Sequence, residues 1–174
     1  MRRSVRFMKK DAHASDCFAI RGNDGRRLHG GSGSRRGEFD KLRHFLAASR
    51  QPVAAILGLT YKPGTSTLRR STSVELCAWL QTQGVRVQAH DPAVQELPEE
   101  IRDIMVLCPS PEEALRGADV AVVATEWPAY RSLAGSQFAA AMRRPQVIDQ
   151  NHFLANVLAA DARITYVATG RAAA

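Results

Sequence analysis

The sequence predicts an α/β fold, a doubly wound parallel sheet in a single domain that spans residues 52–174. Three observations support this prediction. Residues 53–59 form a continuous apolar run, which is typical of a strand buried on both faces. Extended and helical patterns alternate after it, as they do in repeated β-α-β units. The basic residues are concentrated before residue 51, so the expected domain is close to neutral.

The net charge of +7 belongs to the first part of the chain. Residues 1–50 hold 13 Lys and Arg against 5 Asp and Glu, of the 24 basic and 17 acidic residues in all 174. Residues 22–27 and 30–37 are polar and rich in glycine, so we expect residues 1–37 to be a disordered basic leader. A solvated tail is favoured over a nucleic-acid-binding arm, because no aromatic residues are interleaved with the arginines.

Residues 38–51 predict a short lead-in helix, because Phe39, Leu42, Phe45 and Leu46 recur at helical spacing. No apolar run approaches the length of a membrane helix, so we expect no membrane partner. The chain has three cysteines and five histidines, which are Cys17, Cys77, Cys108, His13, His29, His44, His90 and His152. Their spacing fits neither disulfides nor a metal site, which indicates a reducing cytoplasm and histidines on the surface or in loops.

The first repeating unit follows the strand at 53–59. Thr72 and Glu75 predict a capping box, and the apolar residues between 74 and 80, Cys77 included, predict a helix core that stops at Gly84. Residues 85–89 alternate as a second strand, which Asp91-Pro92 ends.

The later units follow the same alternation. Short strands are expected at 105–107, 120–124, 147–148 and 164–167, with helices that open at Ser110 and cover 137–142. The predicted fold is therefore Rossmann-like, with strand order 3-2-1-4-5-6. Ligands of such sheets bind beyond the carboxyl ends of the strands, here between loops 60–70 and 125–130.

The loop after the first strand suits a diphosphate more than a dinucleotide. It lacks G-x-G-x-x-G, having only Gly58 and Gly64, so we interpret Asp91 as part of an Asp-Pro turn rather than as a ribose-binding acid. Residues 61–71 place an aromatic residue and three cations just before a helix N-terminus. Lysine, arginine and free helix N–H groups all bind phosphate oxygens.

Several motifs occur together in this part of the chain: Gly58-Leu59-Thr60-Tyr61-Lys62-Pro63-Gly64-Thr65, Leu68-Arg69, His90-Asp91-Pro92, Gly117-Ala118-Asp119, Thr125-Glu126-Trp127 and Val147-Ile148-Asp149. In order and spacing they resemble the C-terminal, nucleotide-sugar-binding domain of the UDP-glucose/GDP-mannose dehydrogenase family, over residues 50–168. The resemblance implies that Tyr61 and Lys62 contact a UDP-sugar, and that Arg69 reaches an NAD cofactor held mainly by another domain.

The sequence departs from that family in ways that bear on activity. Ser66, Thr67 and Arg70 replace acidic residues, and residues 149–152 read D-Q-N-H where the family has D-G-R-N, so the arginine given there to the sugar nucleotide is missing. The G-x-G-x-x-G domain, the central dimerisation helix and the catalytic cysteine in G-G-S-C are absent, and Cys17 lacks that context. We therefore assign no catalytic or metal-binding residue.

The expected function is that of a truncated or detached UDP-sugar-binding domain of an NAD-dependent nucleotide-sugar dehydrogenase, not active alone. One alternative is a subunit that completes a split dehydrogenase with a separate N-terminal chain. Another is a nucleic-acid-associated protein that acts through its basic leader.

Overall fold

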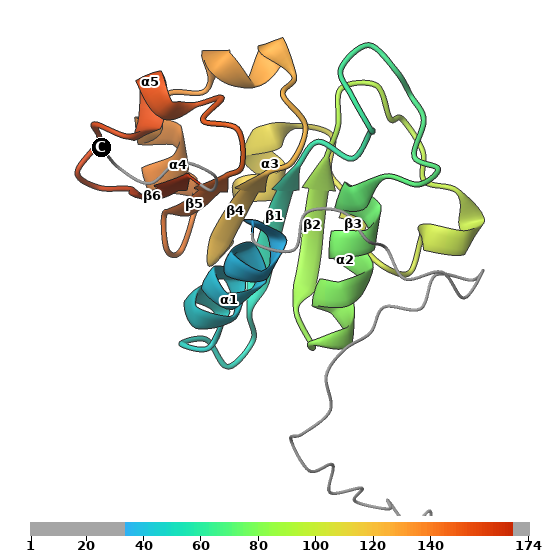
Figure 1. The fold of residues 1–174 in the computed structure, drawn as a ribbon, viewed down its shortest axis with the longest axis horizontal. Helices are drawn as coiled ribbons and strands as arrows, with labels where there is room; N and C mark the ends of the chain where they lie inside the picture. The colour runs from blue at the N-terminus through green and yellow to red at the C-terminus, as the bar shows by residue number, and fades with distance from the viewer. Residues whose placement is uncertain (1–33, 169–174) are drawn as a thin grey trace, which may run out of the picture. The chain divides into compact units, whose positions relative to one another are not determined.

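The computed structural model describes residues 34–168, with side chains from residue 39, and the predicted leader up to residue 33 lies outside this range. Six parallel strands form one sheet in the order β3-β2-β1-β4-β5-β6 (Figure 1). Their bounds are β1 Val53–Leu57, β2 Arg86–His90, β3 Val106–Leu107, β4 Val120–Val123, β5 Gln146–Asp149 and β6 Thr165–Ala168. The predicted doubly wound sheet and its strand order are confirmed.

One face of the sheet is covered by α1 (Ser34–Leu46) and α2 (Thr72–Thr82) (Figure 1). Leu42 of α1 and Cys77 of α2 are fully buried against alternate residues of the central strands, Ala54 and Ile56 among them. Phe39 packs edge-on against Trp79, with the ring centroids 4.6 Å apart. A helix thus precedes β1 as predicted, but it begins at Ser34, inside the range predicted to be a disordered leader, and ends at Leu46 rather than at residue 51. Cys77 is the core residue it was expected to be.

The opposite face is covered by α3 (Pro111–Leu115), α4 (Gly135–Ala141) and α5 (Ala155–Leu158). Here the other set of alternate strand residues, Ala55 and Leu57 in β1, packs with Leu115, Phe138 and Leu158, which are all fully buried. Because β1 is buried on both faces, its continuous apolar sequence is explained by its central place in the sheet.

Two local predictions were wrong. The N-cap of α2 is Ser71, whose Oγ accepts from the Ser73 N–H, and Thr72 is already helical, so the predicted Thr72–Glu75 capping box does not form. A tertiary contact favours Ser71 over Thr72 as the N-cap, because the Ser71 hydroxyl also donates to the Leu59 carbonyl at 2.5 Å. His90 is not a surface or loop residue either, because it ends β2 and is half-buried.

The short 3-10 helices η1 (Glu99–Ile101) and η2 (Pro128–Ser132) lie in the connections that follow β2 and β4. Among the described helices none has both the length and the apolar character needed to cross a membrane.

Candidate functional site

The loops that follow β1 and β4 meet at the carboxyl edge of the sheet, where the sequence places the ligand. The Thr125 hydroxyl donates to the Thr60 carbonyl at 2.6 Å. Gly58 allows this contact, because its φ is +98° and an added Cβ would lie 2.4 Å from the Cβ of Thr125. A residue with a side chain would therefore push the two loops apart.

Asp91 is the centre of a buried hydrogen-bond network below this meeting point. One carboxylate oxygen, Oδ2, accepts from the Leu59 N–H at 2.7 Å, from the Thr60 N–H and hydroxyl at 2.9 Å each, and from the Trp127 indole N–H at 3.1 Å. The other, Oδ1, accepts from the Ala93 N–H at 2.9 Å. The predicted Asp-Pro turn is present, but the carboxylate also ties the ends of β1, β2 and β4 together.

Tyr130 of η2 is a second anchor of the loop after β4. Its hydroxyl donates to the His90 carbonyl at 2.8 Å and lies 3.2 Å from Nδ1 of the same residue. Since the single hydroxyl proton is used on the carbonyl, the neutral imidazole must carry its proton on Nδ1. Burial lowers the pKa of His90, although the charges of Asp91 and Glu112 act in the opposite direction. The ring is therefore neutral at pH 7.

The predicted binding residues lie above this network and are open to solvent. Tyr61 is 71% exposed, and Lys62, Arg69 and Arg70 are exposed as well. Within the described part of the chain none of these three cations takes part in an ion pair. The loop is closed by the Tyr61 N–H, which donates to the Thr67 carbonyl at 3.4 Å, and both Tyr61 and Lys62 follow directly on Thr60, which contacts the loop after β4.

The loop after β5 is held by Asp149. Its carboxylate accepts from the Leu154 N–H at 2.7 Å and from the Tyr166 hydroxyl at 2.8 Å. Asn151 and His152 are exposed, and His152 has a φ of +57°. Phe153 follows, and its ring receives the guanidinium of Arg131 from η2, with 4.4 Å between the guanidinium carbon and the ring centroid.

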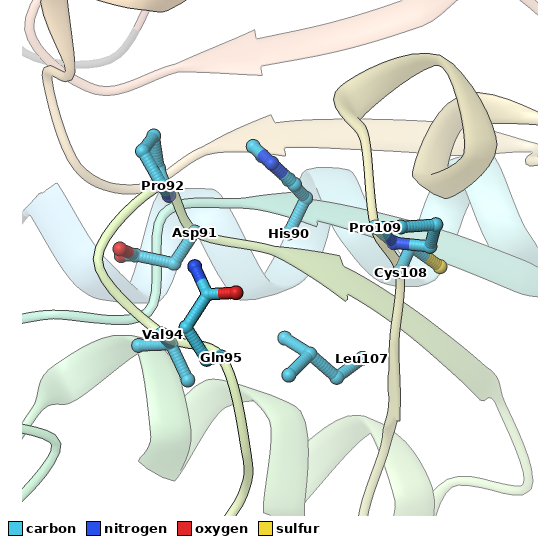
Figure 2. Close-up of a pocket in the computed structure, with 8 residues that line it drawn as sticks. All are labelled: His90, Asp91, Pro92, Val94, Gln95, Leu107, Cys108 and Pro109. Carbon is cyan, nitrogen blue, oxygen red and sulfur yellow. The ribbon is translucent and has the colours of Figure 1, made fainter.

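A pocket of about 320 Å³ opens beyond the ends of β2 and β3, on the other side of Asp91 from the loop after β1 in the order of the strands. Figure 2 shows its lining, which is formed by residues that follow β2, from Asp91 to Gln95, and by Leu107, Cys108 and Pro109 at the end of β3, together with His90. Glu112 lies close enough to His90, and Glu113 to Cys108, for their negative charges to affect these two lining residues. This half of the carboxyl edge therefore does not favour a negatively charged ligand.

The described residues do not fit a dinucleotide as the family of G-x-G-x-x-G sheets holds it. The space at Gly58 is filled by Thr125, and Oδ2 of Asp91 already accepts four hydrogen bonds from the surrounding loops. They also offer no thiolate nucleophile, because burial raises the pKa of Cys77 to about 12 and, with the Glu113 charge, raises that of Cys108. Among residues 39–168 no cluster of side chains could hold a metal ion.

The residues predicted from the sequence to bind a ligand are exposed, whereas the buried residues that hold these loops were not predicted. Lys62 and Arg69 stand out as cations in a loop. The roles of Asp91 and Trp127 depend on partners more than 30 residues away in the sequence. The Thr125-Glu126-Trp127 motif drew attention to this loop, but it did not indicate that Thr125 and Trp127 hydrogen-bond to Thr60 and Asp91.

Comparison with known proteins matches residues 55–156 to the UDP-glucose/GDP-mannose dehydrogenase family, UDP binding domain. The UDP-glucose 6-dehydrogenase of Pseudomonas aeruginosa is 35% identical over 125 residues, which are 68% of this chain and 28% of that protein. The UDP-glucose 6-dehydrogenase AglM of Haloferax volcanii is 40% identical over 96 residues, 55% of this chain and 22% of that protein. The chain thus spans about a quarter of the length of the curated relatives it matches.

Solved structures agree with this assignment. A UDP-glucose dehydrogenase from Pyrobaculum islandicum superposes with a TM-score of 0.56 at 27% identity, over 78% of this chain and 28% of that one. The UDP-N-acetyl-mannosamine dehydrogenase Cap5O from Staphylococcus aureus, at 21% identity and a TM-score of 0.59, shares the fold over 76% of this chain and 30% of its own.

Proposed function

Because the chain belongs to the UDP-glucose/GDP-mannose dehydrogenase family through its UDP binding domain, we propose that the crevice between loops 60–70 and 125–130 binds the uridine diphosphate of a sugar nucleotide. One observation carries this proposal above the others. Lys62, Arg69 and Arg70 are exposed in the loop after β1 without ion-pair partners among the described residues, and the start of that loop is fixed by Asp91. Cations that are free of carboxylates, in a loop fixed at its start, suit a diphosphate.

The proposed roles of the individual residues follow from their chemistry. Lys62 supplies a compact positive charge to a diphosphate oxygen, and the exposed ring of Tyr61 offers a flat surface to the nucleoside or the sugar. Arg69 lies immediately before the turn into α2, and we propose that it contacts NAD held mainly by another domain. That cofactor assignment rests on the family, since the sheet described above does not itself fit a dinucleotide.

We also propose that this chain does not oxidise a sugar nucleotide alone. Oxidation of an alcohol to an acid needs a hydride acceptor and, in this family's chemistry, a thiolate, and neither described cysteine is a thiolate at neutral pH. The free thiols of Cys77 and Cys108 fit the cytoplasm, which is the compartment we propose.

Calorimetric titration of the full chain with UDP-glucose tests the proposal. Loss of a charge-assisted contact at Lys62→Ala should weaken binding about tenfold to hundredfold. Arg69→Ala should weaken it less, because its proposed partner is the dinucleotide. Arg50→Ala, an exposed cation in the connection between α1 and β1, is the control and should bind as the unmodified chain does. Equal losses in all three variants would show diffuse attraction rather than a site.

A second candidate is that the chain completes a split dehydrogenase. The observation that favours it is the coverage, 28% of the Pseudomonas aeruginosa relative. Affinity purification of the chain from its own cells should then recover a polypeptide that carries G-x-G-x-x-G and G-G-S-C, and the mixture should form NADH from NAD and UDP-glucose. A purified mixture with no NADH formation would count against this candidate.

A further inference from the structure

Arg131 is an exposed cation in η2, in the loop after β4, which the Thr125–Thr60 hydrogen bond joins to the loop that carries Lys62. We propose that Arg131, held by the ring of Phe153, is a second anion-binding residue that takes an oxygen of the sugar nucleotide's diphosphate. This inference rests on the proposed function and deepens it. It is drawn from the packing of η2 on the loop after β5.

The backbone that carries Arg131 is fixed on both sides. Trp127, at the N-cap of η2, is tied to Asp91 through its indole N–H, and Tyr130 is fully buried with its hydroxyl on the His90 carbonyl. Arg131 follows directly and turns its side chain outward, toward the loop after β5. The position of its Cα is therefore set by the same network that sets the floor of the crevice.

The side chain is held as well as the backbone. Its guanidinium carbon lies 4.4 Å from the centroid of the Phe153 ring. Phe153 belongs to the segment that Asp149 clamps through the Leu154 N–H at 2.7 Å and the Asn151 N–H at 3.3 Å. Tyr166 of β6 in turn holds the Asp149 carboxylate. A chain of contacts from β6 to Arg131 thus restricts a side chain that would otherwise lose much entropy on binding a ligand.

The N–H donors of Arg131 remain available in this arrangement. Stacking uses the flat face of a guanidinium, whereas its five donors point outward in the plane of the group. No carboxylate pairs with Arg131 anywhere in residues 39–168, and no hydrogen bond from its N–H groups is present there. A planar fork with free donors is the geometry that binds two oxygens of a phosphate at once.

The charges along the carboxyl edge indicate an anion on this half. The loops after β1, β4 and β5 carry four exposed cations, Lys62, Arg69, Arg70 and Arg131, against the single exposed acid Glu126. Apart from the buried Asp91 and Asp119, the connections after β2 and β3 carry six acids, Glu96, Glu99, Glu100, Asp103, Glu112 and Glu113, against two cations, Arg102 and Arg116, which pair with Glu96 and Glu113. A diphosphate is therefore attracted to the half that Arg131 borders.

A double-mutant cycle with UDP as the calorimetric ligand tests this inference on the full chain. Arg131→Ala should weaken UDP binding about fivefold to tenfold, and Arg131→Lys about threefold, because lysine keeps the charge but not the planar fork. Phe153→Leu should weaken binding about threefold in the unmodified chain and have no further effect together with Arg131→Ala. A merely structural role for the pair would shift the unfolding midpoint without this pattern in affinity.

The outcomes separate the two proposals. If the unmodified chain does not bind UDP, the proposed function and this inference both fail. If binding depends on Lys62 but is the same in Arg131→Ala, Arg131→Lys and the parent, only this inference fails. If Phe153→Leu weakens binding equally with and without Arg131, the ring acts on the ligand directly and does not position the arginine. Loss in the predicted order, with coupling between the two residues, supports the assignment.

Discussion

The proposed binding site is formed by two sets of residues that differ in burial and in their contacts. The buried frame, which we define as Gly58, Thr60, Asp91, Thr125 and Trp127, is tightly packed and joined by hydrogen bonds between segments far apart in the sequence. The exposed rim, defined as Tyr61, Lys62, Arg69 and Arg70, has no ion pairs within the described part of the chain and stands in solvent. The frame gives the site its shape, and the rim gives it charge and contact surface.

Because of this difference, we expect substitutions in the frame to change mainly the stability of the chain and substitutions in the rim to change mainly its affinity for a ligand. A change in the frame should alter the free energy of unfolding because it removes buried contacts. A change in the rim should leave the free energy of unfolding nearly unchanged and alter only the affinity for an anion. The predictions below test that separation, beginning with the largest effect.

Gly58→Ala should be the most destabilising substitution, by about 3–4 kcal/mol, because a Cβ meets Thr125 and the residue has a positive φ. Gly64→Ala is the matched control. Gly64 also has a positive φ, of +81°, but no atom lies near its added Cβ, so the cost should be about 1 kcal/mol. Urea unfolding of both variants measures the difference, and equal losses would show that the contact with Thr125 is unimportant.

Asp91→Ala should lower the free energy of unfolding by about 3 kcal/mol, because it leaves the Leu59 and Thr60 N–H groups and the Trp127 indole without their acceptor. Asp103→Ala, at an exposed acid in the connection after β2, should cost less than about 0.5 kcal/mol. Thermal and urea unfolding compare the two. A small loss at Asp91 would mean that the network does not hold the loops together.

The extent to which this site could be predicted follows the same division. The rim residues could be proposed from the sequence because charge, aromatic character and position after an apolar strand are local properties. The contacts of the frame could not be predicted. An Asp that precedes a Pro indicates a turn, but the sequence does not show which distant groups donate hydrogen bonds to its carboxylate. Ser71 and Thr72 are both suitable helix caps, and only the Leu59 carbonyl selects between them. His90 is polar in an alternating strand, but Tyr130, 40 residues away, covers it.

A smaller effect should appear in the pH dependence of stability. Burial lowers the pKa of His90 in the folded chain below its usual 6.5, so below that pH the unfolded chain takes up a proton that the folded chain refuses. The free energy of unfolding should therefore fall as the pH is lowered from 7 toward the pKa of His90 in the folded chain. His90→Gln lacks the proton site and should lose less stability over the same range in urea unfolding. Equal pH dependence in both chains would refute the assignment.

Substitutions in the rim should affect stability least. Lys62→Ala and Arg69→Ala should each change the free energy of unfolding by less than about 0.5 kcal/mol, because both side chains are exposed and without ion-pair partners among the described residues. The measurement is the same urea unfolding that is used for the frame variants. A loss at Lys62 as large as the loss at Asp91 would abolish the distinction between frame and rim.

The most direct test of the binding site is an NMR titration of the full chain with UDP. The account predicts that signals of Tyr61, Lys62 and the Trp127 indole N–H shift together and saturate with one affinity, since Asp91 and the Thr125–Thr60 contact join the two loops that carry them. Signals of Gln95 and Cys108, in the pocket of Figure 2, should stay in place. Shifts confined to that pocket, or none in loops 60–70 and 125–130, would contradict the account.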